Sequence, residues 1–294
     1  MKIYSPHFYL AFFLLLNIFN FVDRNLLIAF APQIKADFNL TNVEWGLLTG
    51  VYFLFFYSVF GIFMGVLGDK FSRMKIAAAG VFLWSLMTAF TGIAKNFTHL
   101  IVARALIGVG ESALTPNSIS MLSDVYDQSK RGTASAIYYL GIPLGVGFGM
   151  LIAAYFGPMV GWRTVFISLG IIGMILGVIT YFLIEPIRGK LDLSIQNDHK
   201  IMSIREIISL TKSTLYTSKS LTFVIVGSIF LHIPLGAGNF EVLWAVNERG
   251  FSSSEYNSLF GIFFILGGSV GAILGGVLSD KLSHYFKGGV MSFL

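Results

Sequence analysis

Four ionisable residues lie inside long apolar segments of the sequence, where they could move protons or bind anions. They are Asp23, Arg24, Arg104 and Glu111. An ionised side chain at the centre of a bilayer costs about 2.5–3.5 kcal/mol on insertion scales, so such groups usually face a protein interior or a water-filled cavity. We therefore expect these side chains to meet in one buried cluster of two acids and two bases.

The first apolar segment carries a polar stripe at helical spacing. Asn17, Asn20 and Arg24 are three and four positions apart, and Asp23 lies beside them on an otherwise Phe- and Leu-rich helix. With a rise of about 1.5 Å per residue, Arg24 lies about 24 Å from the inner edge of the membrane. The stripe predicts a face that contacts substrate through Asn17, Asn20 and Arg24.

The fourth apolar segment carries a matching face. Arg104, Gly108, Glu111 and Thr115 recur at spacings of four, three and four, and the glycine allows close helix approach. The helix rise places Arg104 about 25 Å and Glu111 about 15 Å from the inner edge. Arg104 is thus level with Arg24, and Thr115 is a further candidate for substrate binding.

This cluster has two interpretations. The charges could form structural ion pairs that fix helix packing. Alternatively, they could form a proton-coupled binding site, because a carboxylate beside a mobile cation changes its proton affinity with conformation and bound substrate. In the second interpretation, which we favour, Asp23 and Glu111 titrate, Arg24 holds an anionic group, and Arg104 exchanges partners as protons move.

The composition indicates a membrane protein. The chain has 294 residues, of which 55% are hydrophobic and 12% charged, and its mean hydropathy is +0.77. It contains no cysteine, which excludes disulfides and Cys-based metal sites. The net charge is +5, but the cations lie in short loops rather than on one face of a soluble domain, so this charge does not indicate nucleic-acid binding. We expect the bilayer, protons and a small solute as partners, and no cofactor.

Eight apolar segments predict eight transmembrane helices in an all-α fold. A polar stretch separates the sixth from the seventh and contains Ser203-Ile204-Arg205-Glu206, a capping-box pattern that predicts a short amphipathic surface helix or, alternatively, a disordered linker. We expect a six-helix bundle over 1–185, a cytoplasmic linker over 186–219, and a partial second bundle over 220–294. The segments run from about residue 7–31, 44–68, 75–95, 98–122, 132–157, 163–184, 220–246 and 256–279.

The placement of Lys and Arg predicts the orientation. With the N-terminus in the cytoplasm, most loop cations fall on the cytoplasmic side, and the opposite side keeps four. Those four are Lys35, Lys95, Arg163 and Arg249. We expect a multi-pass protein of the inner or plasma membrane with a cytoplasmic N-terminus.

A charged loop follows the second segment and recurs after the eighth with the same spacing of Gly, Asp, Lys and Ser. Such a repeat predicts two structurally equivalent bundles. The residues concerned are Gly65, Asp69, Lys70 and Arg73 in the first copy, and Asp280 and Lys281 in the second.

Glycine and proline mark two further segments. The fifth contains Gly145, Gly147 and Gly149, which predict a packing seam that can also flex between bundles, and Tyr139 just before it is a candidate to point into the cavity. In the seventh, Pro234 and nearby glycines predict a broken helix, a device that transporters use near their sites.

These motifs resemble the major facilitator superfamily. The loop Gly65-x-x-x-Asp69-Lys70-x-x-Arg73-x-Lys75 is similar to that family's loop between spans two and three, and Arg104-x-x-x-Gly108-x-Gly110 resembles its fourth-span motif. Asn20-Phe21-Val22-Asp23-Arg24, Trp84-Ser85-Leu86 and the glycines before Glu111 resemble the spinster-like branch most. The anion:cation symporter branch shares Asp23-Arg24 and the spacing from Arg104 to Glu111.

The resemblance implies a twelve-span, two-bundle transporter with alternating access, of which this sequence holds the first bundle and two helices of the second. It implies that Asp23 and Glu111 are proton-coupling carboxylates, with Arg24 a substrate contact and Arg104 their partner. It also implies a cytoplasmic gate latch. The latch residues are Asp69, Lys70 and Arg73, mirrored by Asp280 and Lys281, with His284 in place of the second arginine.

Two functions therefore compete. The first is a proton-coupled transporter of an organic anion or an amphipathic, lipid-like solute, and the second is a truncated, transport-inactive membrane fragment. A retinal photoreceptor needs a buried lysine in the last span, whereas Lys219 and Lys281 lie at span ends. The sequence has no His-Glu-x-x-His motif and no Ser-His-Asp arrangement, so we do not expect an enzyme.

Overall fold

The computed structural model describes residues 4–189, 191, 209, 213–214 and 217–283. All helices of the predicted first bundle lie in this part of the chain, whereas the amphipathic helix expected from Ser203 lies outside it. The described residues contain helices and no strand. The all-α membrane fold expected from composition is therefore confirmed.

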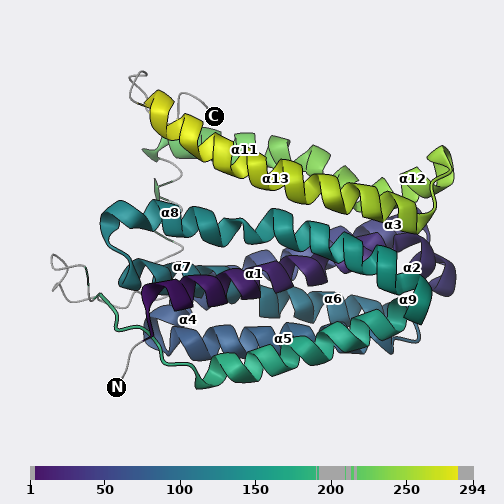
Figure 1. The fold of residues 1–294 in the computed structure, drawn as a ribbon, viewed down its shortest axis with the longest axis horizontal. Helices are drawn as coiled ribbons and strands as arrows, with labels where there is room; N and C mark the ends of the chain where they lie inside the picture. The colour runs from purple at the N-terminus through teal and green to yellow at the C-terminus, as the bar shows by residue number, and fades with distance from the viewer. Residues whose placement is uncertain (1–3, 190, 192–208, 210–212, 215–216, 284–294) are drawn as a thin grey trace.

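The helices of the first bundle run roughly along one axis (Figure 1). They are α1 (Pro6–Ala29), α2 (Ala31–Phe38), α3 (Asn42–Gly46), the π-helix η1 (Leu47–Val51), α4 (Tyr52–Lys70), α5 (Arg73–Gly92), α6 (Phe97–Glu111), α7 (Leu114–Val125), α8 (Gln128–Tyr139) and α9 (Gly141–Phe182). After the linker come α11 (Lys219–Ala237), the 3₁₀ turn η2 (Gly238–Phe240), α12 (Glu241–Arg249) and α13 (Ser253–Ser283). Each of the eight predicted segments corresponds to part of this list.

Among the described residues, six helical stretches are long and apolar enough to cross a membrane, and Lys219–Phe230 is a shorter apolar helix. The longest stretch runs over 55 residues from Gln128 to Phe182 and includes the predicted fifth and sixth segments. It turns at Gly161, whose φ of 78° and ψ of 157° suit glycine because no Cβ is present to clash. One continuous stretch therefore supplies two passes.

Two other helices are interrupted at positions that bear on the site. The helical run of the fourth segment breaks between Glu111 and Leu114, because Pro116 has no N–H to donate to the carbonyl one turn earlier. The seventh segment breaks into α11 and α12 at the turn Gly238–Phe240, as its glycines predicted, whereas α11 continues through Pro234, where the sequence also predicted an interruption. Glu111 therefore sits at the end of α6 rather than in mid-helix.

The glycines of α9 pack on two sides. A Cβ on Gly145 would lie 2.5 Å from the Ile18 carbonyl oxygen of α1, and one on Gly147 would lie 2.7 Å from the Gly261 carbonyl oxygen of α13. Both approaches are too close for any larger residue. The predicted packing seam is confirmed, and it joins α9 both to its own bundle and to the partial second one.

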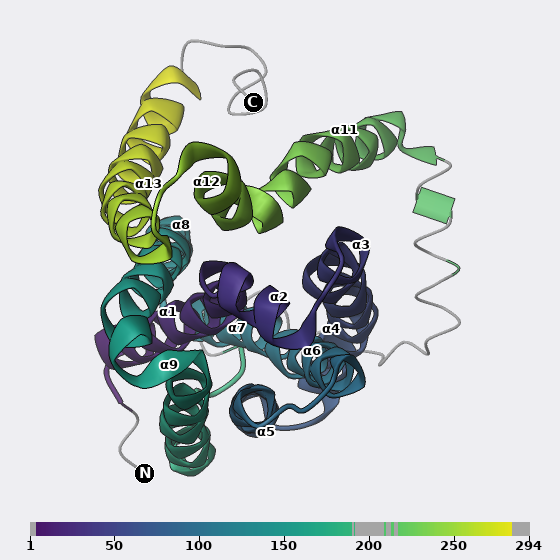
Figure 2. The same cartoon turned by 90° about the vertical axis from the view of Figure 1, so that its right-hand side faces the viewer.

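The two bundles meet at the end opposite the N-terminus, where α2, α3 and α12 lie together (Figures 1 and 2). Val242 and Leu243 of α12 are buried in one apolar cluster with Leu26, Leu27 and Trp45 of the first bundle. A second apolar cluster, at the N-terminal end, draws its members from the first bundle alone. The described contacts thus close one end between the bundles.

Candidate functional site

Arg24 and Glu111 form an ion pair between α1 and the end of α6. Arg24 Nη2 donates to Glu111 Oε2 over 2.5 Å, and Arg24 Nε donates to the same oxygen over 3.0 Å. The long guanidinium side chain spans the difference in depth that the helix rise predicts for the two backbones. The Arg24 side chain is 23% exposed, whereas that of Glu111 is fully buried.

Aromatic rings lie against both arginines. Arg24 Cζ lies 4.7 Å from the ring centroid of Phe53, 5.0 Å from that of Tyr57 and 4.9 Å from that of Phe21. Arg104 Cζ also lies 4.7 Å from the Phe53 centroid. Ring faces attract guanidinium groups without accepting their strong hydrogen bonds. Arg104 Nε has no hydrogen-bond partner among the described residues and is available to another acceptor.

Several buried polar atoms of this cluster have no hydrogen-bond partner among the described residues. They are Asp23 Oδ1, Glu111 Oε1, Arg104 Nε and Asn20 Nδ2. Asp23 Oδ2 accepts a hydrogen bond from the Thr88 hydroxyl. Each unsatisfied buried polar group costs about 1–3 kcal/mol, so four in one place mark a site that another species can complete. The structure thus brings together all four of the predicted ionisable residues.

Other predicted ligand residues gather around Tyr138. Asn17 Nδ2 donates to the Tyr138 carbonyl oxygen over 2.8 Å, and the hydroxyls of Thr115 and Tyr138 lie 3.2 Å apart. Tyr138 is fully buried, whereas Tyr139 is 45% exposed and its ring lies 5.3 Å from that of Tyr138. Substrate contact by Asn17, Thr115 and Tyr139 stays a prediction, since two of the three already bind Tyr138.

Thr88 is a site residue that the sequence did not predict. It lies on α5, is 1% exposed, and supplies the described hydrogen bond to Asp23. A signal was present, since Trp84, Thr88 and Thr91 recur at helical spacing in the predicted third segment. Threonine is common in such helices, where its hydroxyl usually bonds its own backbone.

At the N-terminal end of the bundle, Arg73 is buried and every nitrogen of its guanidinium has a partner. Nε donates to Glu185 Oε1 over 2.9 Å, and Nη1 donates to Asp124 Oδ2 over 2.5 Å and to Ser120 Oγ over 2.9 Å. Nη2 donates to the Pro186 carbonyl oxygen over 3.3 Å. This residue therefore ties α5 to α7 and to the segment after α9.

That segment, Ile184–Gly189, is held by further hydrogen bonds. The Ser72 hydroxyl donates to Glu185 Oε2 over 2.6 Å, and the Gly189 N–H donates to Asp124 Oδ1 over 2.9 Å. Burial alone would raise the pKa of Glu185, but the hydrogen bonds from Ser72 and the Arg73 guanidinium outweigh it and hold that pKa below its usual value. The ionised form of the Glu185 carboxyl is thus favoured.

The predicted latch residues do not all join this network. Arg188 donates to the carbonyl oxygens of Gly68, Asp69 and Phe71 and so caps the end of α4. The side chains of Asp69 and Lys70 are exposed, and a Cβ on Gly65 would meet nothing within 4 Å. The side chains of Asp280 and Lys281 lie outside the described residues. Gating by these residues stays a prediction.

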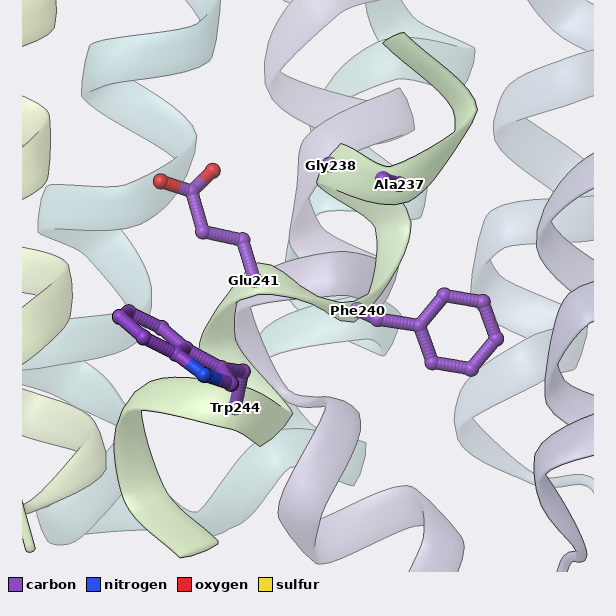
Figure 3. A pocket seen from close by; sticks show the side chains of 5 residues that line it. All are labelled: Ala237, Gly238, Phe240, Glu241 and Trp244. Atoms are coloured by element: carbon purple, nitrogen blue, oxygen red, sulfur yellow. The ribbon is translucent and has the colours of Figure 1, made fainter. Parts of the chain in front are cut away.

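At the opposite end, neutral hydrogen bonds cross between the bundles. Trp45 Nε1 donates to the Asn239 carbonyl oxygen over 2.9 Å, and Asn257 Nδ2 donates to the Ala29 carbonyl oxygen over 3.0 Å. A pocket lies beside this contact, where Phe240 points to one side and Glu241 and Trp244 point to the other (Figure 3). The closed end is therefore held by uncharged groups.

Comparison with known proteins agrees with this architecture. The sequence profile of the Major Facilitator Superfamily matches residues 13–294. Protein spinster of Drosophila melanogaster is 27% identical over 90% of this chain and 44% of its own length. Human protein spinster homolog 1 is 28% identical over 92% of this chain and 53% of its own length. The chain thus spans about half the length of these relatives.

A third relative, the sphingosine-1-phosphate transporter SPNS2 of Danio rerio, is 32% identical over 60% of this chain and 36% of its own length. Among solved structures, a bacterial homologue of the human lysosomal transporter Spinster aligns with a TM-score of 0.77 and 25% identity. That alignment covers 96% of this chain and 62% of the other, which was crystallised in an inward-facing and occupied conformation. An unoccupied inward-facing form aligns with a TM-score of 0.78.

Proposed function

The chain belongs to the Major Facilitator Superfamily, and on that basis we propose that it acts in proton-coupled secondary active transport. The solute is an organic anion or an amphipathic, lipid-like molecule that carries an anionic group. Transport proceeds by alternating access of the charge cluster to the two sides of the membrane. The N-terminus lies in the cytoplasm, and the membrane is the inner or plasma membrane.

The cluster of Asp23, Arg24, Arg104 and Glu111 is the observation that carries this proposal. Two acids and two bases cancel when all are ionised, so the buried site is neutral. When one acid takes up a proton, a net positive charge stays behind in a medium of low dielectric constant. An anion cancels that charge. Proton binding and anion binding therefore favour one another, which is the requirement for coupled transport.

The arrangement suggests a role for each group. Protonation of Glu111 weakens its hold on the Arg24 guanidinium, which is the partly exposed member of the pair. A released guanidinium binds carboxylate or phosphate through two parallel hydrogen bonds. Arg104, whose Nε has no described partner, then pairs with the carboxylate that stays ionised. Asp23 is the second group that takes up a proton. Asn20 Nδ2 is a further free donor for the solute.

The name of one relative supports the solute class. The Danio rerio relative is named for sphingosine-1-phosphate, which is an amphipathic molecule with a phosphate group. The aromatic rings of Phe21, Phe53 and Tyr57 beside Arg24 fit a solute whose charged group adjoins an apolar body. For this chain, the solute class is defined by an anionic group and an adjoining apolar body rather than by any one molecule.

Gating is assigned to the last turns of α4, the short loop after them and their repeat in the second bundle. Asp69 and Lys70 are exposed in a state that is closed at the opposite end, so they are available to bind the other bundle when the N-terminal end closes. Gly65 and Arg73 support this loop, and Asp280 and Lys281 occupy equivalent places in the second copy. The latch forms in the opposite state of the transport cycle.

The test is uptake of radiolabelled organic anions and a lysophospholipid into proteoliposomes that hold the purified chain, with and without a pH gradient. A second preparation carries the chain extended by four further spans from a relative. Accumulation by the chain as given, dependent on the gradient, supports the proposal and contradicts the inactive-fragment alternative. Accumulation by the extended protein alone assigns the given chain to that alternative, and absence of accumulation in both overturns proton-coupled transport of this class.

A further inference from the structure

The Thr88 hydroxyl lies between two acceptors and has one hydrogen to give. Its oxygen is in hydrogen-bond contact with Asp23 Oδ2 and lies 3.0 Å from the carbonyl oxygen of Trp84, one turn earlier on α5. A hydroxyl can donate to only one of these acceptors at a time, but its oxygen can also accept. The contact is buried.

We propose that Thr88 is a positioning residue that lets Asp23 hold or release a proton without moving. When Asp23 is ionised, Thr88 donates its hydrogen to Oδ2. When Asp23 is protonated on Oδ2, that proton is donated to the Thr88 oxygen, and the Thr88 hydrogen turns to the Trp84 carbonyl. In both protonation states a hydrogen bond then joins Thr88 to Asp23, with its direction reversed. The inference deepens the proposed function and rests on it for the role of Asp23.

The surroundings of Asp23 leave this task to Thr88. Glu111, Arg104 and Arg24 are the charged groups that face Asp23, and among the described residues none of them lies within ion-pair distance of it. Among the described residues, the Thr88 hydroxyl is thus the side-chain group that hydrogen-bonds to the Asp23 carboxyl. A change in the protonation of Asp23 therefore first reverses the direction of its hydrogen bond to Thr88, which joins α1 to α5.

Thr91 on the same helix offers a matched control. It is also 1% exposed, and its hydroxyl donates to the Met87 carbonyl oxygen over 2.9 Å, one turn earlier. The described contacts of its hydroxyl include no side-chain acceptor. Replacing either threonine with valine removes a hydroxyl and keeps the branched shape. A difference between the two variants therefore isolates the contact with Asp23.

The experiment is infrared difference spectroscopy of the purified full chain between acid and alkaline pH. The carbonyl stretch of protonated Asp23 is identified as the band that Asp23→Asn removes. In Thr88→Val we expect this band at higher wavenumber, because the carboxyl has lost its hydrogen-bond partner. We also expect its pH midpoint to move by about one unit, because the ionised form has lost its donor. Thr88→Ser keeps the wild-type band and midpoint, and so does Thr91→Val.

Thermal unfolding of each variant shows that it is folded, and Thr88→Ser provides a second test if Thr88→Val unfolds. A band and midpoint in Thr88→Val equal to those of wild type overturn the proposal. So does the absence of any band that Asp23→Asn removes. Because this readout needs no transport, its failure is distinguishable from failure of uptake in proteoliposomes.

Discussion

Two charged clusters in the first bundle contain the same residue types but differ in how completely they are paired. At the N-terminal end, every guanidinium nitrogen of Arg73 and all four oxygens of Asp124 and Glu185 have a partner. In the membrane interior, one oxygen of Asp23, one oxygen of Glu111 and Arg104 Nε have no partner among the residues that the structure describes. The first cluster is complete, and the second is open.

The difference separates the two interpretations that the sequence left open for buried charges. A cluster whose hydrogen bonds are all made stabilises the fold and has little to offer a ligand, which describes the Arg73 cluster. A cluster with free donors and acceptors gives up stability, and it gains when protons or solute complete its bonds. This contrast predicts that equal substitutions in the two clusters have opposite consequences for stability and transport.

The largest expected effect is on stability, in the complete cluster. Arg73→Ala leaves the buried Asp124 carboxylate without its cation and leaves Glu185 with Arg188, 3.6 Å away, and removal of one partner of a buried pair costs about 3–5 kcal/mol. Thermal unfolding in detergent measures the loss. Lys70→Ala, at an exposed position at the end of α4, is the control and should unfold near the wild-type temperature. Equal unfolding temperatures for the two variants would show that the network is not structural.

In the open cluster, Glu111→Gln should abolish pH-driven accumulation and leave the protein folded. Glutamine keeps an oxygen for the Arg24 guanidinium but cannot take up a proton, so we expect at least about a tenfold loss of gradient-driven uptake, or about 1.4 kcal/mol. The control is Glu185→Gln, the same chemical change in the complete cluster, which should retain uptake. Accumulation by Glu111→Gln under a pH gradient would remove this residue from proton coupling.

Arg24→Lys should weaken the binding of anionic solutes without abolishing insertion into the membrane. A lysine ammonium keeps the charge but loses the planar fork and its stacking on Phe53, so we expect about a tenfold rise in Kd. Binding is measured by isothermal titration across carboxylates and phosphates. Arg163→Lys, outside the cluster, serves for comparison. An unchanged Kd for Arg24→Lys would exclude direct contact with the solute.

The sequence predicted the elements of both clusters better than their pairing. Hydrophobic periodicity located the helices and the shared faces of Asp23, Arg24, Arg104 and Glu111, because burial is a property of each helix. It did not predict that the segment after α9 folds back onto α5 and α7, since Glu185 belongs to a polar stretch without periodicity. Partners from distant segments follow from tertiary packing, which one sequence does not encode at the level of single contacts.

The smallest expected effect concerns the pH dependence of the complete cluster. Hydrogen bonds from Ser72 and Arg73 hold the pKa of Glu185 below its usual value of about 4.5, so the ionised carboxylate stabilises the folded state above that pH. As the pH falls through the lowered pKa, the carboxyl is protonated and this contribution is lost. The unfolding temperature of wild type should therefore fall more steeply below about pH 4.5 than that of Glu185→Gln, which has no carboxyl to protonate at this position. Glu248→Gln, an exposed position on α12, should follow the wild-type curve, and parallel curves for all three proteins would show that Glu185 is not held in its ionised form.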